Sequence, residues 1–220
     1  MSERPIVIAG SGLAGWTVAR ELRALSSDRP ITLVTANSGD FYSKPMLSNA
    51  FAQGKSPANL LQATGAAQAA KYDVTLMANT TVTSIEAAQR TLQVGSNRLP
   101  YGDLVLALGA APVRLSLPGA AFICSVNDWW DYAAFRDRMS RAPNPAAVRV
   151  VILGAGLIGC EFANDLAGAG HSVTLVDPGE RTLNRLINEG DSLRLQTALH
   201  ELDVNFRFGK TARAVNEALD

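Results

Sequence analysis

The chain has 220 residues, of which 47% are hydrophobic and 18% are charged, with 20 basic and 20 acidic side chains. This composition indicates a folded globular protein, and the balanced charge disfavours a protein that coats nucleic acid or an anionic membrane. No apolar run approaches the roughly 20 residues of a membrane span, and the N-terminus lacks a secretory signal pattern. We therefore expect a cytoplasmic protein with no nucleic-acid partner and no membrane insertion.

Neither cysteines nor histidines suggest a metal site. Cys124 and Cys160 are too far apart for a CxxC redox pair or a zinc motif. His171 and His200 have no third ligand in the pattern, so we assign them neither a metal nor a catalytic role.

A strand–turn–helix–strand pattern opens the chain. Residues 5–25, PIVIAGSGLAGWTVARELRAL, join a β-branched run to the pattern G-x-G-x-x-G and a helix-type segment, and PITLVT follows at 30–35. A βαβ unit of this kind seats the pyrophosphate of a dinucleotide on its tight turn. Thr35 stands 20 residues after Gly15, where the motif usually has an acid. We expect its hydroxyl or main chain to bind the ribose.

The next feature is a lysine in an unusual loop. DFYSKPMLS, residues 40–48, places Lys44 between Ser43 and Pro45 in a half-apolar stretch that proline makes rigid. Such a loop is an unusual place for a cation that only has to be solvated.

Short apolar segments follow. We interpret 74–78, 81–87 and 91–95 as three short strands of a meander, and 103–112, DLVLALGAAP, as a buried parallel strand. The crossover at 113–147 contains a helix at 125–139, capped by Asn127 or Asp128, with an apolar face of Trp130, Ala134 and Phe135. Trp129 and Trp130 are expected in the core.

The opening pattern then recurs at 148–177, VRVVILGAGLIGCEFANDLAGAG followed by HSVTLVD. In each copy the first glycine permits the tight turn, the second lets the backbone approach a pyrophosphate, and the third lets the helix lie close to the strand. The two copies place these glycines and the neighbouring candidate nucleotide contacts at Gly10, Ser11, Gly12, Leu13, Ala14 and Gly15, and at Gly154, Gly156, Leu157, Ile158 and Gly159. Alternatively, both are packing turns of an ordinary α/β protein.

The second copy carries the expected acid. Asp177 lies 18 residues after Gly159, and a carboxylate there accepts from a ribose 2′-hydroxyl and repels a 2′-phosphate, so NAD is favoured over NADP. Nearby Arg181 works against this preference. A helix at 188–202 and a strand at 204–209 complete the pattern.

Four motifs together, GSGLAG, YSKPMLS, LVLALGAAP and GAGLIGCEFANDL, give the chain a resemblance to a known family. It resembles the FAD-dependent pyridine nucleotide-disulfide oxidoreductase superfamily, and within it most closely the bacterial rubredoxin–NAD reductases. The resemblance implies an α/β fold with two Rossmann-like FAD/NAD(P)-binding units of three-layer ββα type. It also implies that the family's C-terminal portion is missing, which leaves an incomplete FAD-binding domain at 1–112 and an incomplete NAD-binding domain at 113–220.

The resemblance also implies roles for individual residues. Lys44 is placed at the edge of the flavin ring, where its ammonium group favours the reduced cofactor, and Glu161 is its expected partner. Alternatively, Glu161 only complements the dipole at the start of its helix. Val82 is expected to meet the FAD adenine through its backbone, although it also suits an ordinary strand.

The implied function is electron transfer. Relatives that reduce disulfides carry cysteines around residues 41–48, and none occurs there in this chain. We therefore expect electrons to pass from NADH through FAD directly to rubredoxin or another small iron–sulfur or iron carrier. The alternatives are a truncated, non-catalytic dinucleotide-binding module and a ferredoxin reductase component of an oxygenase system.

Overall fold

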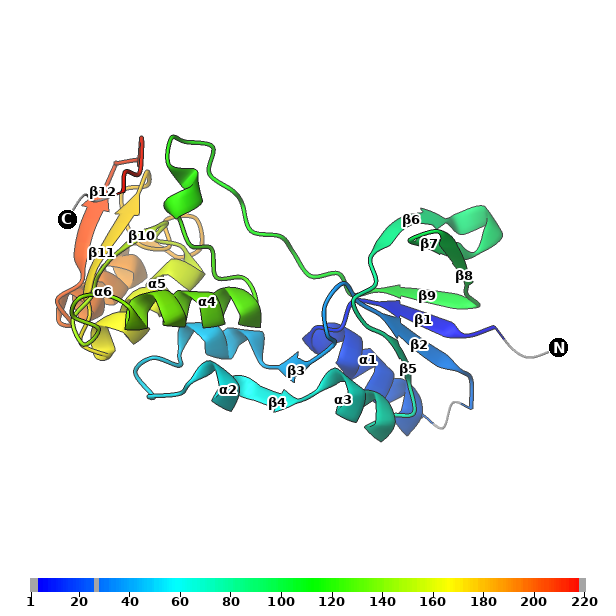
Figure 1. The fold of residues 1–220 in the computed structure, drawn as a ribbon. Coiled ribbons are helices and arrows are strands. Elements are labelled where there is room, and N and C mark those ends of the chain that lie inside the picture. Colours follow the sequence, from blue (N-terminus) through cyan, green and yellow to red (C-terminus); the bar gives the residue numbers. More distant parts are fainter. Residues whose placement is uncertain (1–3, 26–27, 218–220) are drawn as a thin grey trace. The chain divides into compact units, whose positions relative to one another are not determined.

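The computed structural model describes residues 4–25 and 28–217, so residues 218–220 of the predicted NAD-binding domain lie outside it (Figure 1). The chain forms two compact units, each discontinuous in sequence. The first unit contains Met1–Lys44 and Asn59–Ala111, and the second contains Pro45–Ala58 and Pro112–Asp220. The predicted boundary at residue 112 differs from this division in the placement of the segment 45–58, and as a boundary between cofactor domains it stays a prediction.

A parallel sheet forms the centre of the first unit. Its strand order is β5-β2-β1-β9, and the four strands are β1 (Ile6–Ala9), β2 (Ile31–Val34), β5 (Thr75–Met77) and β9 (Asp103–Leu106). β1 pairs with both β2 and β9, with Ile6 opposite Ile31 on one side and Asp103 on the other. The helix between β1 and β2 is α1 (Leu13–Ala24), and α3 (Gly65–Lys71) precedes β5.

The two faces of this sheet bury different clusters, because successive strand residues point to opposite sides. On one face Ile8 packs with Trp16 and Ala19 of α1. On the other face Val7 packs with Leu92 and Val94, which belong to an antiparallel meander. The meander consists of β6 (Val82–Glu86), β7 (Thr91–Val94) and β8 (Asn97–Pro100), with η2 (Ala87–Gln89) between its first two strands. Helices, parallel sheet and meander make the predicted three-layer arrangement.

The second unit repeats the βαβ plan with a smaller sheet. Its parallel strands are β10 (Arg149–Leu153), β11 (Ser172–Asp177) and β12 (Asn205–Phe208), in that order. The helices are α4 (Trp129–Ser140), α5 (Leu157–Gly168) and α6 (Glu189–His200). Ala163 and Leu166 of α5 are buried with Val173 and Leu175 of β11. The α/β fold with two Rossmann-like units is therefore confirmed.

The remaining elements are short. β3 (Phe41–Tyr42) and β4 (Leu61–Ala63) pair antiparallel, with η1 (Lys44–Ser48) and α2 (Pro57–Leu60) between them in the chain. η3 (Ala120–Phe122) lies in the crossover.

The structure contradicts the predicted meander in one strand. Residues 74–78 do not join it: β5 pairs parallel with β2 in the main sheet, and the third meander strand is β8, for which no strand was predicted. The burial of Val74 and Leu76 against the α1 side of the sheet explains this pairing. A tight turn at Gly95, with φ +58°, joins β7 to β8.

The segment 103–112 is shorter and more exposed than predicted. β9 ends at Leu106, and within the part of the chain that the structure describes it pairs only with β1, which makes it an edge strand of the sheet. Leu106 and Leu108 are 55% and 68% exposed. The continuous apolar run led to the prediction of a buried strand. Such a run does not reveal whether a strand lies at the centre or at the edge of its sheet.

The helix at 129–140 is capped as predicted by Asp128, whose carboxylate accepts from the Asp131 N–H. Of its predicted apolar face, Phe135 is half-buried and packs against the rings of Phe51 and Phe162, whereas the other two residues are exposed. Trp130 is 38% exposed and Ala134 is exposed, whereas Tyr132 and Met139 are buried. Trp129 is half-buried, with its indole N–H donating to the Pro57 carbonyl. The placement of Trp130 in the core is therefore corrected.

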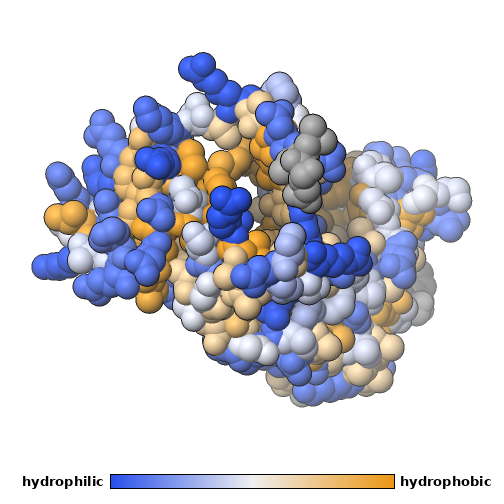
Figure 2. Space-filling view, turned by 60° about the vertical axis from the view of Figure 1, so that its left-hand side comes forward, coloured by the Kyte–Doolittle hydropathy of each residue, from blue (hydrophilic) through white to orange (hydrophobic). Residues whose placement is uncertain are grey.

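Hydrophobic residues stay accessible between hydrophilic ones on the face in Figure 2, where orange and blue residues are interspersed. The exposed large side chains of the second unit include Val151, Leu186 and Leu193. Within residues 4–25 and 28–217, no helix has the length and apolar character that crossing a membrane requires.

Candidate functional site

The first glycine turn needs glycine at two of its three places. Gly10 has φ +109°, and a Cβ there would lie 2.1 Å from the Ala107 carbonyl oxygen. A Cβ on Gly15 would lie 1.9 Å from the Gly10 carbonyl oxygen, so any larger residue would push α1 away from the turn. These contacts explain the close approach of helix and strand that the sequence predicts.

Gly12 differs from both, because apart from its immediate chain neighbours no atom of the described residues lies within 4 Å of its would-be Cβ. Its φ of −70° and ψ of −172° suit any residue, so neither packing nor backbone strain requires glycine there. Gly12 is also the N-cap of α1 and makes no side-chain cap, which leaves the first helical N–H groups for an anion. Leu13 and Ala14 are exposed beside it. The residues present therefore fit a bound diphosphate.

The second turn repeats this geometry. Gly154 has φ +114°, a Cβ on Gly159 would lie 1.9 Å from the Gly154 carbonyl oxygen, and Gly156 faces open space. Gly156 caps α5 without a side-chain hydrogen bond. Leu157 and Ile158, the next two residues, are 55% and 54% exposed. This turn therefore fits a second diphosphate in the same way.

Polar groups gather where the strands of the first unit end. The Ser11 hydroxyl lies 2.8 Å from the Thr35 hydroxyl, and both hydroxyls donate to Asn37 Oδ1, at 3.0 and 2.9 Å. Ser11 and Thr35 are buried. Adjacent parallel strands bring these residues together, because their carboxyl ends meet at one edge of the sheet. Thr35 thus lies beside Ser11 of the first glycine turn and beside Asn37, and its contact with a ribose stays a prediction.

In the second unit, Asp177 stands at the end of β11. One carboxylate oxygen accepts from the Ala155 N–H at 2.7 Å, and the other accepts from the Gly179 N–H at 2.6 Å. The acid is therefore fixed against its own glycine turn. Arg181 Nε is buried and finds no hydrogen-bond partner within the described residues.

Lys44 and Glu161 fall in different units, since the boundary lies within η1 directly after Lys44. Lys44 is exposed. Glu161 is half-buried and accepts a 2.6 Å hydrogen bond from Ser48 Oγ, a partner that the sequence analysis missed. Glu161 is the fifth residue of α5, and the first turn of that helix contains no acid. The predicted Lys44–Glu161 pair and the predicted contact of Val82 stay predictions.

Asp165, also missed in the sequence, fastens the segment 45–58 to α5. Its carboxylate accepts from the main-chain N–H groups of Phe51 and Ala52, at 2.8 and 2.9 Å. The Asp165 residue is only 2% exposed. The segment that follows Lys44 in sequence is thereby held by the helix that carries Glu161.

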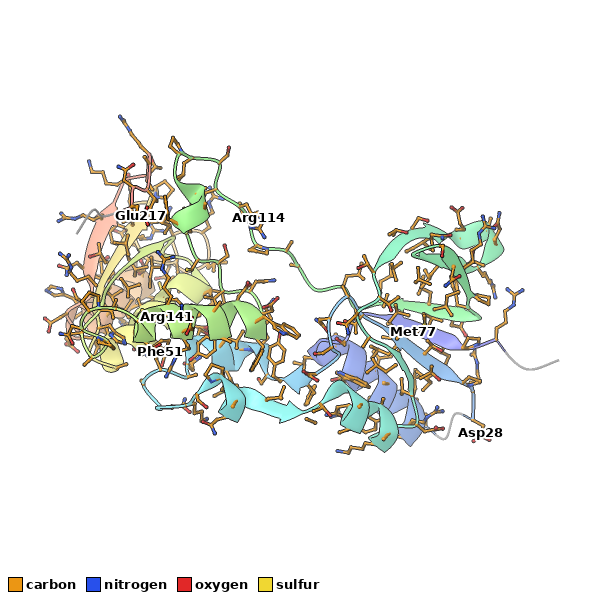
Figure 3. All side chains as sticks on the ribbon, in the orientation of Figure 1. Asp28, Phe51, Met77, Arg114, Arg141 and Glu217 are labelled. Carbon is orange, nitrogen blue, oxygen red and sulfur yellow. The ribbon has the colours of Figure 1, made fainter. Side chains whose placement is uncertain are left out.

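Phe51 completes this attachment. Its ring lies beside those of Tyr132 and Phe135 of α4, and the Arg136 guanidinium carbon stands 3.9 Å from its centroid. Figure 3 labels Phe51 next to this helix. His171 meets the same ring edge-on at a centroid distance of 5.6 Å. A ring enclosed on several sides buries much apolar area. No periodicity in the sequence predicts it, because 45–58 is distant from α4 along the chain.

Cys160 is a packing residue in this setting. Burial, with smaller contributions from the nearby Asp177 and Glu161 carboxylates, raises the pKa of its thiol to about 11. Its sulfur lies 3.4 Å from the Ala155 carbonyl oxygen, to which it donates. The thiol therefore stays protonated at neutral pH and is a poor nucleophile. Both cysteines are free.

Three comparisons with known proteins bear on this arrangement. Over 214 residues the chain is 42% identical to the rubredoxin-NAD(+) reductase of Alcanivorax borkumensis, covering 96% of this chain and 55% of that protein. It is 37% identical over 206 residues to the nitric oxide reductase FlRd-NAD(+) reductase of Aeromonas hydrophila, covering 94% of this chain and 52% of the other. The chain thus spans about half the length of these curated relatives.

The fold likewise matches solved structures. The covalent putidaredoxin reductase–putidaredoxin complex superimposes with a TM-score of 0.86 at 28% identity, covering 99% of this chain and 52% of the other. The pyridine nucleotide-disulphide oxidoreductase family model matches residues 4–220. With both glycine turns in place and this match over nearly its whole length, the chain belongs to the pyridine nucleotide-disulphide oxidoreductase family.

Proposed function

We propose that this chain supplies the FAD and NAD sites of a reductase that passes electrons from NADH, through FAD, to rubredoxin or a similar small iron protein. The observation that carries the proposal is the open space at Gly12 and at Gly156. Each lies at the start of a helix whose first N–H groups have no side-chain cap. Two such turns in one chain support two dinucleotides.

The residues of the first turn, with Ser11 and Thr35 at the strand ends, would hold FAD. Those of the second turn, with Asp177, would hold NAD. Bound FAD supplies hydride acceptance followed by release of single electrons. The chain supplies the anchors for the two phosphate groups, the ribose contacts and, through Lys44, a positive charge that favours the reduced flavin.

Asp177 supports NADH as the donor. Its carboxylate is already held by two main-chain N–H groups, so it is fixed in place to accept from a ribose 2′-hydroxyl as well. The negative charge of Asp177 would repel the 2′-phosphate of NADPH.

The acceptor is inferred from the relatives. The names of the two curated proteins specify rubredoxin-NAD(+) and FlRd-NAD(+) reductases, and the solved complex pairs a reductase with putidaredoxin. Rubredoxin is preferred because that relative is the more similar of the two curated ones. A ferredoxin reductase component of an oxygenase system is the second candidate, supported by the 27% identity to the ferredoxin reductase for the CYP199A2 system of Rhodopseudomonas palustris. A cytoplasmic location is part of the same proposal, and cell fractionation would test it.

The test is a titration of the purified chain with FAD and then with NADH under anaerobic conditions. We expect FAD to bind at one equivalent, NADH to bleach the visible absorbance of the flavin, and added rubredoxin to restore it. Gly12→Val should abolish FAD binding and leave NADH binding intact, and Gly156→Val should do the reverse.

Two results would contradict the proposal in different ways. Binding of NADH without FAD would favour the non-catalytic dinucleotide-binding module. Bleaching by NADH that ferredoxin reverses and rubredoxin does not would favour the ferredoxin reductase reading.

A further inference from the structure

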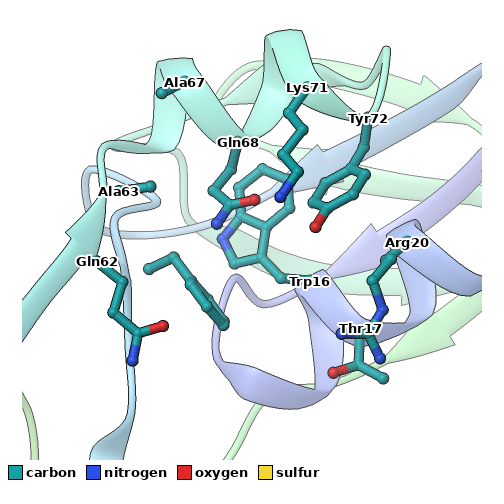
Figure 4. A pocket seen from close by; sticks show the side chains of 10 residues that line it. Trp16, Thr17, Arg20, Gln62, Ala63, Ala67, Gln68, Lys71 and Tyr72 are labelled. Carbon is teal, nitrogen blue, oxygen red and sulfur yellow. The ribbon is translucent and has the colours of Figure 1, made fainter.

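A cavity distinct from both glycine turns lies in the first unit between α1 and α3. Its volume is about 400 Å³, within the usual range for small-molecule sites. In Figure 4, Gln68 and Lys71 project from α3 toward α1, which contributes Trp16, Thr17 and Arg20. Tyr72 stands beside Lys71. All the lining residues belong to this one unit.

Gln68 is the feature that packing does not explain. The residue is 6% exposed, and its amide oxygen is buried without a hydrogen-bond partner in the described residues. A buried polar atom in this state costs free energy unless a ligand satisfies it. Because an amide oxygen only accepts, the missing group is an O–H or N–H donor.

The charged side chains that line the cavity are all basic. Arg20 and Lys71 line the cavity, and none of its ten lining residues is acidic. Arg20 is paired with Glu21 at 2.8 Å, but both side chains of that pair are more than half exposed, so the pairing is weak. The Lys71 ammonium stands 5.1 Å from the Tyr72 ring centroid and forms no salt bridge within the described part of the chain. Such a lining favours a negatively charged ligand.

Half of the residues that line the cavity are apolar or aromatic. Trp16, Phe41 and Tyr72 supply aromatic groups, and Ala63 and Ala67 supply small apolar ones. The Trp16 indole N–H already donates to the Gly39 carbonyl at 2.9 Å. A ligand can therefore contact only the apolar part of the indole. A planar ring suits such walls.

We infer that this cavity binds an aromatic carboxylic acid that carries a hydroxyl or N–H donor. The ring lies among Trp16, Phe41 and Tyr72, the donor reaches the Gln68 amide oxygen, and the carboxylate lies near Lys71 and Arg20. This ligand site is separate from the proposed FAD and NAD sites and does not depend on them.

A purely structural role for these residues gives different expectations. Lys71 lies in the last turn of α3, where a cation complements the helix dipole without any ligand. In that case Lys71→Met lowers stability and leaves small-molecule binding unchanged. Binding measurements therefore separate the two roles.

The test is isothermal titration calorimetry of the 220-residue chain with 4-hydroxyphenylacetate as the probe. We expect one saturable site with a Kd of about 1 mM or below. Phenylacetate, which lacks the donor, should bind roughly threefold to tenfold more weakly, and 4-hydroxyphenylethanol, which lacks the charge, should bind about tenfold more weakly.

Variants assign these losses to residues. In Gln68→Met the advantage of 4-hydroxyphenylacetate over phenylacetate should disappear, and in Lys71→Met its advantage over 4-hydroxyphenylethanol should shrink. Gln89→Leu and Lys210→Met make comparable changes at exposed positions outside the cavity and should change neither ratio. Far-UV circular dichroism and the melting temperature report whether each variant folds.

The inference is overturned if no compound gives saturable binding, or if the two variants keep both ratios of the unaltered chain. If Gln68→Met fails to fold, the unaltered chain decides: equal affinity for phenylacetate and 4-hydroxyphenylacetate removes the role of the amide oxygen.

Discussion

At the scale of single residues, Asp165 gives the clearest prediction about the free energy of unfolding. Its buried carboxylate accepts from two main-chain N–H groups of the segment 45–58. Asp165→Asn leaves one oxygen for two donors and presents an NH₂ group to the other, so we expect the free energy of unfolding to fall by about 1–3 kcal/mol. Chemical denaturation of both proteins measures this difference.

Asp137→Asn is the matched control, because among the described residues the exposed Asp137 carboxylate pairs only with exposed Arg141. That change should cost less than about 1 kcal/mol. If both variants lose the same free energy of unfolding, the buried hydrogen bonds of Asp165 stabilise the second unit no more than an exposed ion pair does.

Replacing Lys44 tests whether its single positive charge contributes to the proposed electron transfer. Removing its ammonium group in Lys44→Met should lower the midpoint potential of bound FAD and slow its reduction by NADH, because a nearby cation favours the reduced flavin. Redox titration and stopped-flow absorbance are the measurements. Lys55→Met, in the segment 45–58, should leave both values unchanged. An unaltered potential in Lys44→Met would remove the lysine from the site.

Asp177 governs the choice of nucleotide in the same proposal. Asp177→Asn keeps an oxygen for a main-chain donor but removes the charge that repels a 2′-phosphate. We expect the ratio of the Kd for NADPH to that for NADH to fall by roughly tenfold, which corresponds to about 1.4 kcal/mol. Asp203→Asn, at an exposed position of the same unit, serves as control. A ratio that stays constant would argue against this reading of Asp177.

At the scale of elements, each glycine turn contains residues that the fold needs and one residue that only the proposed nucleotide would need. Gly12→Ala and Gly156→Ala meet open space and ordinary backbone angles, so the free energy of unfolding should stay the same or rise by about 0.4–1 kcal/mol. The same methyl group should weaken FAD or NADH binding, respectively.

Gly15→Ala and Gly159→Ala should behave in the opposite way. Each new Cβ would lie 1.9 Å from a carbonyl oxygen of its own turn, so the loss should exceed about 1 kcal/mol. Thermal melts and nucleotide titrations of the four variants give the comparison. If all four lose stability equally, the second glycine is a packing residue and the diphosphate interpretation fails.

The elements also show what the sequence could predict. The two turns, the Asp128 cap and the strands β1, β2, β10 and β11 follow from local patterns, because their signals lie within a few residues. The pairing of β5 with β2 and the exposure of Trp130 depend on which faces are covered, which no local pattern contains. For the candidate site, motif spacing indicated Thr35 and Asp177, and their nucleotide contacts stay predictions. Ser48 and Asp165 were missed, because their partners lie more than a hundred residues away in the chain.

At the scale of the whole molecule, His171 links the stability of the second unit to pH. Burial, aided by the Arg136 charge, lowers the pKa of His171 below 6.5, and its Nδ1 accepts from the Val148 N–H, which the neutral ring allows. The unfolded chain therefore takes up this proton at higher pH than the folded one. The stabilising contribution is present above pH 6.5 and is lost as the pH falls below that value.

We expect the free energy of unfolding to drop between pH 7.5 and pH 5.5 by up to about 1 kcal/mol more in the unaltered chain than in His171→Gln. Denaturation curves at the two pH values measure the drop. His200→Gln, at the exposed end of α6, should retain the full dependence. An identical drop in all three proteins would assign the acid sensitivity to the carboxylates.

The membership of 45–58 in the second unit has a consequence for anyone who divides this protein. The polypeptide passes from one unit to the other after residues 44, 58 and 111. Cutting the gene once, at the third passage, would therefore give a downstream product without Phe51, and the aromatic rings of α4 would face water. A recombinant form of the second unit, or a chimaera built with it, must therefore include residues 45–58 as a grafted peptide.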